Sequence, residues 1–289
     1  MTDVRELIKE GEIKPDRRLG QCFLADGRVA GRIAELADLT PDDHVIEVGP
    51  GVCALTELLC ARARTVTAVE IDGRLTRLIH GAMSRHKNFS LINADILKLP
   101  KEALLPPGGA PPRANVKFVS NMPYGISTPV MTRLFCEFTF VGRSVLMMQR
   151  EVSDKIIAAP STQNYCMLSV LANACASPER AFFVPPHCFA PQPGVESAVM
   201  TFQTHAAPAA DAAYSEIFFR AVRAAFTGRR KTLANCLVRA GLAADRGAAE
   251  AATERAGVDP GARGESLDAA AFISLARALM FYGGCVNIS

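Results

Sequence analysis

Short apolar runs and amphipathic segments alternate along the first two thirds of the chain. Five of the runs are typical of buried β-strands, at residues 44–48, 65–69, 89–93, 116–120 and 144–148. Before and between them, apolar residues recur at helical spacing, as in Val29, Ile33 and Leu36. Strands that alternate with helices predict a parallel sheet with helices on both faces. An alternating run at 195–203 predicts one further strand.

Beyond the fifth apolar run, from residue 149 onwards, the pattern is mostly helical. Helical spacing also predicts helices at 149–158 and 165–176, followed by a Pro-rich loop at 182–194. After an Ala-rich linker, helical spacing continues almost to the end of the chain. We therefore expect an α/β domain of the Rossmann-like type and a small C-terminal all-helical domain. The expected boundaries are a flexible N-terminal arm at 1–16, the α/β domain at 17–205 and the helical domain at 206–289.

Composition narrows the class of protein. The 289 residues are 49% hydrophobic and 21% charged, as in ordinary globular proteins. No apolar run reaches membrane-spanning length, and residues 1–18 contain no apolar signal core. The nine cysteines are odd in number and form no C-x-x-C pair, and the five histidines show no ligand spacing. We expect a soluble, cytoplasmic protein with reduced cysteines and no metal site.

The charge is weakly basic, but it is unevenly distributed. A net charge of +3 alone argues little for nucleic acid. Arg17 and Arg18 form one local cluster, and Arg229, Arg230 and Lys231 form another at the start of a predicted helix. Because the helix dipole disfavours cations at that end, an anionic partner such as RNA phosphate suits the second cluster. A solvated basic turn is the alternative interpretation.

Two features of the α/β pattern predict a nucleotide site. Gly49 and Gly51 begin a G-x-G-x-x-A sequence between a strand and a helix, where backbone N–H groups can approach a ligand. Glu70 ends the next strand, where a carboxylate can accept hydrogen bonds from ribose hydroxyls. Asp95 follows the third strand, and it is predicted either to bind an adenine amine or to cap a helix.

The strand at 116–120 leads into Asn121-Met122-Pro123-Tyr124, where Pro123 forces a turn. The Asn121 side-chain oxygen and the carbonyl of Pro123 can both accept hydrogens from an exocyclic amine. The Tyr124 ring can stack on a flat base. Phe189, in the Pro-rich loop, is predicted either to stack on the same base or to anchor the core. An ordinary Asn-Pro turn is the alternative interpretation.

Taken together, these residues make the chain similar to the rRNA adenine N6-dimethyltransferases. The similarity spans about residues 17–275. It is carried by Leu19-Gly20-Gln21-Cys22-Phe23-Leu24, Glu47-Val48-Gly49-Pro50-Gly51, Ala68-Val69-Glu70-Ile71-Asp72, Asn121-Met122-Pro123-Tyr124, the run 189–199 and the basic helix start at 226–237.

The resemblance implies S-adenosyl-L-methionine as the methyl donor of a Rossmann-like methyltransferase domain. It implies dimethylation of two adjacent adenosines near the 3′ end of small-subunit rRNA, during ribosome biogenesis, by a monomer whose helical domain docks on the small subunit. The implied donor contacts are Gln21, Cys22, Leu24, Gly49, Gly51, Glu70, Ile71, Asp95, Ile96 and Asn121. The implied catalytic residues are Asn121, Pro123, Tyr124 and Phe189, and the implied RNA contacts are Arg17, Arg18, Arg229, Arg230 and Lys231.

This chain departs from the family pattern at three positions. Cys22 stands where the family usually has Asn, Met122 where it usually has Leu, and Gly125 where it usually has a larger polar residue. Three alternative functions remain: a large-subunit rRNA methylase of the antibiotic-resistance type, an NAD-dependent oxidoreductase and a non-catalytic RNA-binding factor. The Leu-Gly-Gln start favours the small-subunit group over the first, and Asn-Met-Pro-Tyr has no role in hydride transfer.

Overall fold

The computed structural model describes residues 4–11, 13–106, 108–109, 111–205, 212–228 and 231–282. Its helices are α1 (Val4–Lys9), α2 (Gly27–Leu36), α3 (Thr56–Cys60), α4 (Thr76–Met83), α5 (Ser127–Cys136), α6 (Arg150–Ile156), α7 (Met167–Cys175), α8 (Ala212–Thr227), α9 (Leu233–Arg239), α10 (Arg246–Arg255) and α11 (Ala269–Tyr282). Its strands are β1 (Phe23–Leu24), β2 (His44–Val48), β3 (Thr65–Glu70), β4 (Phe89–Asn93), β5 (Val116–Asn121), β6 (Arg143–Gln149), β7 (Ala176–Val184), β8 (Phe189–Ala190) and β9 (Ser197–Thr204).

Contacts divide the chain into two compact units. The α/β unit comprises Met1–Ser153 and Ser177–Thr204, and the helical unit comprises Asp154–Ala176 and His205–Ser289. Residues 154–176, which the sequence pattern places in the 17–205 domain, thus pack with the C-terminal helices. The reason is the composition of α7, which is apolar on nearly every side and is buried over most of its length.

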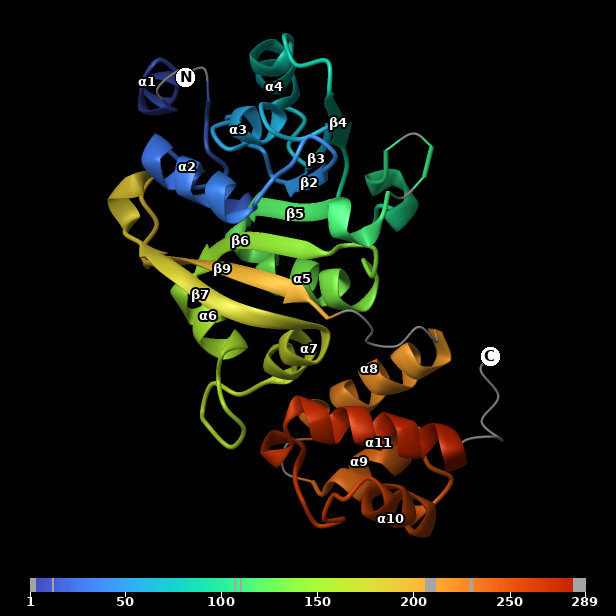
Figure 1. Ribbon diagram of the computed structural model, residues 1–289. Coiled ribbons are helices and arrows are strands. Elements are labelled where there is room, and N and C mark those ends of the chain that lie inside the picture. Colours follow the sequence, from blue (N-terminus) through green and yellow to red (C-terminus); the bar gives the residue numbers. More distant parts are fainter. Residues whose placement is uncertain are drawn as a thin grey trace. The chain divides into compact units, whose positions relative to one another are not determined.

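The main sheet has the strand order β4-β3-β2-β5-β6-β9-β7, and Figure 1 shows these strands stacked from β4 to β7. The strands from β4 to β6 are parallel to their neighbours, as predicted. The sheet is not entirely parallel, because β9 pairs antiparallel with β6. Beyond β9 lies β7, a strand that the sequence pattern did not predict. Its Pro178 and its charged residues suit an edge strand, which needs only one row of backbone hydrogen bonds.

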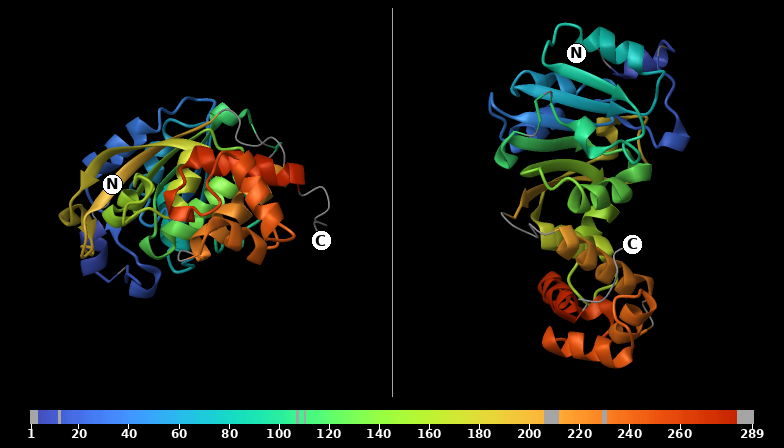
Figure 2. Two further views of the ribbon diagram at one scale, coloured as in Figure 1. Left: turned by 90° about the horizontal axis from the view of Figure 1, so that it is seen from below. Right: turned by 90° about the vertical axis from the view of Figure 1, so that its right-hand side faces the viewer.

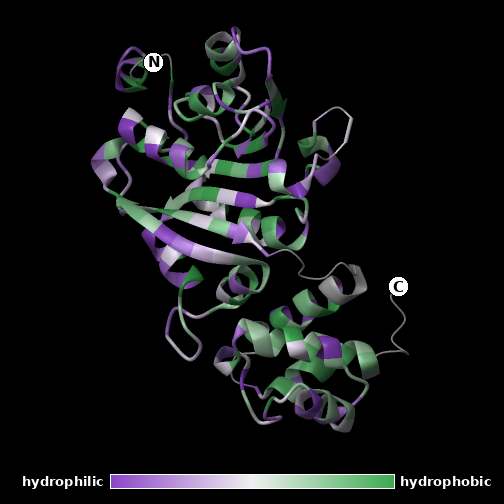
Figure 3. Ribbon diagram, viewed as in Figure 1, coloured by the Kyte–Doolittle hydropathy of each residue, from purple (hydrophilic) through white to green (hydrophobic). Residues whose placement is uncertain are grey.

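The core of the α/β unit lies around the central strands. All five residues of β2 are buried, and Figure 3 shows apolar residues concentrated in the middle of the sheet and polar ones on β7. The predicted flexible arm differs in the structure, because residues 4–9 form α1. Val4, Leu7 and Ile13 are buried in the same core as the strands. The burial of these apolar side chains is the reason that the arm is ordered.

The helical unit has an aromatic core of its own. The Phe226 ring packs against Tyr165 and Phe272, at centroid distances of 5.9 and 6.2 Å, and the Tyr165 hydroxyl donates to the Leu267 carbonyl at 2.6 Å. Figure 2 shows the helices from α8 to α11, coloured orange to red, packed on one another. Gly264 allows a close approach, since a Cβ there would lie 2.5 Å from the Cβ of Ala225.

Two features are absent from the part of the chain that the structure describes. No helix among them combines the length and the hydropathy that a membrane crossing requires. They also contain no group of three or more His, Cys, Asp and Glu side chains arranged to hold a metal ion.

Candidate active site

The carboxyl ends of four parallel strands meet along one edge of the sheet. Glu70 at the end of β3 is in register with Asn93 at the end of β4, and Asn121 ends β5 beside β6. A cavity of about 220 Å³ opens at this edge. It is lined by residues 18–23, 48–49, 51, 69–71, 94–97 and 121–126. The structure therefore brings the predicted glycine turn, acidic residues and Asn-Met-Pro-Tyr loop to a single site.

The glycine turn is shaped by its protein neighbours. Gly49 and Gly51 have φ values of +70° and +55°, a region that L side chains rarely adopt. A Cβ on Gly49 would lie 3.0 Å from Pro123, and one on Gly51 would lie 2.9 Å from the Phe23 ring. The two glycines thus bring the turn into contact with the Pro123 loop and with β1, and they leave its backbone open to the cavity.

Glu70 presents an oriented carboxylate to the cavity. Its side chain is buried, and its Oε1 accepts a hydrogen bond from the Asp72 N–H at 2.9 Å. Burial raises the pKa of Glu70 above its ordinary value. The adjacent Ile71 is 51% exposed and offers an apolar surface at the same position. A carboxylate beside an apolar side chain suits a ribose whose base lies against that side chain.

Asp95 lines the cavity, and its carboxylate also accepts a hydrogen bond within the turn that follows it, which is not a helix. Its Oδ1 accepts from the Leu97 N–H at 2.9 Å. Arg133 on α5 donates to the carbonyls of Ile96 and Leu99 and so holds this loop in place. Sequence reasoning missed Arg133, because nothing local links it to residues 95–99.

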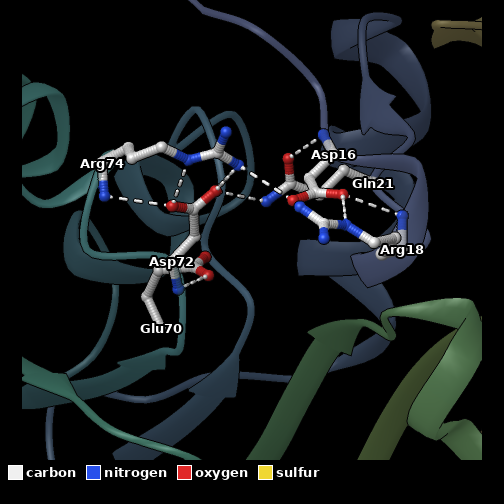
Figure 4. Close-up of polar contacts among 6 residues, drawn as sticks. All are labelled: Asp16, Arg18, Gln21, Glu70, Asp72 and Arg74. Carbon is white, nitrogen blue, oxygen red and sulfur yellow. Dashed lines mark hydrogen bonds and ion pairs between the residues drawn. The ribbon is translucent and has the colours of Figure 1, made fainter.

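Residues 18–23 form the third wall of the cavity. The Gln21 carboxamide accepts from the Asp16 N–H at 2.8 Å and donates to Asp72 Oδ2 at 2.9 Å (Figure 4). Cys22 lines the cavity, and burial raises the pKa of its thiol, which therefore stays protonated. Leu24 is buried in β1 and is absent from the cavity lining, so a direct side-chain contact with a ligand does not follow from this arrangement.

Asp72 and Arg74 lie outside the cavity lining but hold this wall through Gln21, and they were not predicted as site residues. Arg74 donates to both oxygens of Asp72, at 2.8 and 2.6 Å (Figure 4). This guanidinium is the main reason that the pKa of Asp72 falls to about 2. An Asp-x-Arg sequence directly after a strand was the available signal, but its partner Gln21 lies far away in the sequence.

The target loop begins at Asn121, the last residue of β5. Met122 is buried, and its N–H donates to the Met147 carbonyl at 2.9 Å. The Pro123 carbonyl accepts from the Ile126 N–H and from the Ser127 hydroxyl, both at 3.1 Å. These two bonds occupy both lone pairs of that oxygen. The predicted use of the Pro123 carbonyl as an acceptor therefore requires one of the two bonds to be exchanged for the ligand.

Tyr124 lines the cavity, whereas Phe189 does not. The Tyr124 and Ser197 hydroxyls lie 2.6 Å apart in a hydrogen bond, and burial raises the pKa of Tyr124 to about 12. Phe189 is 1% exposed in the core, and its ring meets Tyr124 edge to face at a centroid distance of 6.4 Å. The expected sandwich of a base between the two rings is not formed by this arrangement. Pairing of β8 with β1 buries Phe189, and the structure supports its alternative role as a core anchor.

The predicted RNA contacts are only partly described. The Arg18 side chain is 92% exposed on the cavity wall, 3.5 Å from Asp16. The side chain of Arg17 and all of Arg229 and Arg230 lie outside the described residues. Lys231 is exposed and precedes α9.

Comparisons with known proteins identify the family of this chain. A family model described as ribosomal RNA adenine dimethylase matches residues 13–280. The chain belongs to this family. The protein is therefore an rRNA methyltransferase. The ribosomal RNA small subunit methyltransferase A of Geobacter metallireducens is 39% identical over 272 residues, which cover 94% of this chain and 98% of the relative.

Two solved structures share the fold, and the first of them is also similar in sequence. The 23S rRNA methyltransferase ErmE is 32% identical, with a TM-score of 0.64, and the match covers 89% of this chain and 99% of ErmE. A dimethyladenosine transferase from Plasmodium falciparum is 20% identical, with a TM-score of 0.72, over 90% of this chain and 98% of that protein. The second match shows the shared Rossmann-like fold with a helical C-terminal part.

Proposed function

We propose that this protein transfers two methyl groups from S-adenosyl-L-methionine to the N6 atom of each of two adjacent adenosines near the 3′ end of small-subunit rRNA. The observation that carries the proposal is the meeting of Glu70 and Asn121 on one cavity, from the ends of β3 and β5. The small-subunit target follows the named relative rather than ErmE, because the relative is the more similar in sequence, at 39% against 32% identity.

The residues of the donor side fit S-adenosyl-L-methionine. Glu70 offers a carboxylate for the ribose hydroxyls, and Ile71 and Ile96 offer apolar contact for the adenine ring. The turn at Gly49 and Gly51 leaves backbone exposed for the amino acid part. The donor supplies an electrophilic methyl group on a sulfonium sulfur.

Asn121 is the residue that prepares the target. The N6 atom of adenine is a weak nucleophile, since its lone pair is delocalised into the ring. An N6–H that donates to Asn121 Oδ1 is held in a geometry that favours a pyramidal nitrogen. The Pro123 carbonyl holds the second N6–H after it releases Ile126 or Ser127. Catalysis then consists mainly of positioning and electrostatics.

Tyr124 supplies the surface on which the target base rests. Its hydroxyl is fixed by Ser197, so the ring presents a constant orientation to the cavity. A base within an RNA stem must leave its stack to reach this position. The raised pKa keeps the phenol neutral at physiological pH, so Tyr124 takes part as an aromatic surface and not as a base.

The remaining parts of the proposal concern the partner and the compartment. Arg18 on the cavity wall is suited to a phosphate beside the target base. The helical unit, with Lys231 at the start of α9, is proposed to dock on the ribosomal small subunit in the cytoplasm. We propose that the protein acts as a monomer.

Methylation of small subunits that lack the modification tests the function directly. Purified protein, labelled S-adenosyl-L-methionine and undermodified small subunits should yield two adjacent dimethyladenosines, located by mass mapping of rRNA fragments. Large subunits form the parallel sample, because ErmE acts on 23S rRNA. Label in 23S rRNA alone would replace the small-subunit proposal with the large-subunit one, and monomethylated products alone would contradict dimethylation.

A further inference from the structure

Residues 16–23, which we name the strap, extend between the two halves of the cavity. The strap lines the cavity from Arg18 to Phe23. It approaches the target loop closely, since a Cβ on Gly20 would lie 3.3 Å from the Gly125 nitrogen. It approaches the glycine turn through Phe23, whose ring lies 2.9 Å from a Cβ built on Gly51. The strap thus contacts elements of both halves of the site.

A closed circuit of polar contacts ties the strap to the loop after β3. Gln21 bridges Asp16 and Asp72, with bonds of 2.8 and 2.9 Å. Arg74 donates hydrogen bonds to both carboxylate oxygens of Asp72, and the Arg74 Nη2 lies 3.6 Å from Asp16 Oδ2. Figure 4 shows these side chains pointing toward one another from two segments that are distant in sequence. Both the oxygen and the nitrogen of the Gln21 carboxamide are engaged, which leaves this side chain one orientation.

Asp72 links this circuit to the predicted ribose ligand. Asp72 is 6% exposed, and its carboxylate remains charged over the physiological pH range. Its backbone N–H donates to Glu70 Oε1 at 2.9 Å, while its side chain accepts from Gln21. One residue therefore orients the carboxylate of Glu70 and also fastens the strap.

We propose that Asp72 and Gln21 are positioning residues that clasp the strap over the donor and couple donor binding to the target loop. The proposal rests on the proposed function only in taking the cavity as the donor site. When the clasp is closed, Glu70 is oriented and Gly20 is held against Gly125. Because coupling between two ligands is reciprocal, RNA binding should strengthen donor binding by the same factor.

The first test is a double-mutant cycle on donor-site affinity. S-adenosylhomocysteine is titrated by calorimetry into Asp72→Ala, Gln21→Ala and the double variant. Each single change should weaken binding by about tenfold, the effect of losing a hydrogen bond to a charged group. The double variant should be no weaker than the worse single variant, because either change opens the same clasp. Asp72→Asn, which keeps an acceptor for Gln21 but loses the ion pair, should lie between wild type and Asp72→Ala.

The chain contains a matched control for the Asp-x-Arg pair. Arg28 donates its N–H, Nε and Nη2 to Asp26, as Arg74 does to Asp72. The Asp26 pair caps the start of α2, whereas the Asp72 pair is bonded to Gln21 of the strap. Arg74→Ala should therefore weaken S-adenosylhomocysteine binding, whereas Arg28→Ala should leave the affinity unchanged.

The second test follows the strap itself. Trypsin should cleave after Arg18, whose side chain is exposed, and S-adenosylhomocysteine should slow this cleavage in the wild-type protein. At saturating ligand, Asp72→Ala should lose most of that protection, although its fold is retained as judged by thermal unfolding. A residue that only stabilised the fold would change the unfolding temperature and would leave the ligand-dependent protection intact.

The outcomes separate this proposal from the proposed function. Unchanged affinity in Asp72→Ala, an additive cycle, or full trypsin protection in Asp72→Ala overturns the clasp, even in a protein that methylates small subunits. A non-additive cycle with lost protection supports the clasp, even if the rRNA target proves different. Neither measurement requires RNA, so failure of the methylation assay does not affect them.

Discussion

The donor half of the cavity and its target half are held together in different ways. On the donor side, Glu70 and Asp72 have defined hydrogen-bond partners, and the Arg74 guanidinium fixes the charge of Asp72. On the target side, the Pro123 carbonyl accepts two hydrogen bonds from its own loop, and Phe189 is buried. The donor half is thus preorganised by contacts within the protein, whereas the function proposed above requires a target base to replace contacts that the other loop makes with itself.

The largest expected effect concerns the target half. Asn121→Ala should lower methyl transfer by about 100-fold or more, as does the loss of one oriented hydrogen-bonding group in other active sites. Binding of S-adenosylhomocysteine should persist, because the donor half keeps its own contacts. Methyl incorporation into undermodified small subunits and calorimetry measure the two quantities. Wild-type turnover in this variant would remove Asn121 from the mechanism.

A smaller effect is expected on the donor half. Glu70→Ala should weaken donor binding by about 1–3 kcal/mol, the contribution of hydrogen bonds to a charged group. Glu57→Ala is the control, because Glu57 pairs with Arg85 and is absent from the cavity lining. Equal donor dissociation constants for both variants would show that Glu70 does not hold the ribose.

The glycine turn allows the preorganisation of the donor half to be tested through stability. Gly51→Ala should destabilise the fold by about 1–3 kcal/mol, because its Cβ collides with Phe23 and its φ is positive. Gly31→Ala provides the contrast, since a Cβ there meets nothing within 4 Å and Gly31 is inside α2. That change should stabilise the protein by about 0.5–1 kcal/mol. Urea unfolding distinguishes the two, and a stable Gly51→Ala variant would argue against a tightly packed turn.

The smallest expected effect is a pH dependence of folding stability that comes from Glu47, a buried residue of β2. Glu47 is 1% exposed, and burial raises its pKa from about 4.5 to about 8. Its Oε2 has no hydrogen-bond partner among the described residues. A raised pKa in the folded state means that this group favours folding at low pH and that the contribution is lost as pH rises from about 4.5 to 8.

Glu47→Gln should therefore raise the unfolding temperature more at pH 8 than at pH 5. The reason is that Gln mimics the neutral carboxylic acid and removes the cost of ionising a buried group. Thermal unfolding at a series of pH values measures the difference between the two proteins. A difference that does not change with pH would mean that Glu47 ionises normally in the folded protein.

Most residues that line the cavity were predictable as candidates, because each occupies a position that local pattern reveals. Gly49, Glu70 and Asn121 follow apolar runs, and side chains at the carboxyl ends of parallel strands meet at one edge. The helical character of the last third was predictable for the same reason, since apolar periodicity is a local property. The described helices from α8 to α11 agree with that prediction.

Local pattern failed where a contact joins distant segments or where a strand is an edge. β7 contains Pro178, and exposed residues alternate with half-buried ones along it, so its sequence resembles a loop. The Gln21–Asp72 bond spans 51 positions, and no periodicity relates the two residues.

The sequence by itself thus determined which chemical groups stand at the strand ends, because residue type and the end of an apolar run are local properties. Only the tertiary structure decided which of the predicted groups reach the cavity and which are free to bind. Pairing of β8 with β1 buried Phe189, and the turn after Pro123 engaged its carbonyl. The physical reason is that burial and hydrogen-bond satisfaction depend on neighbours supplied by the whole fold.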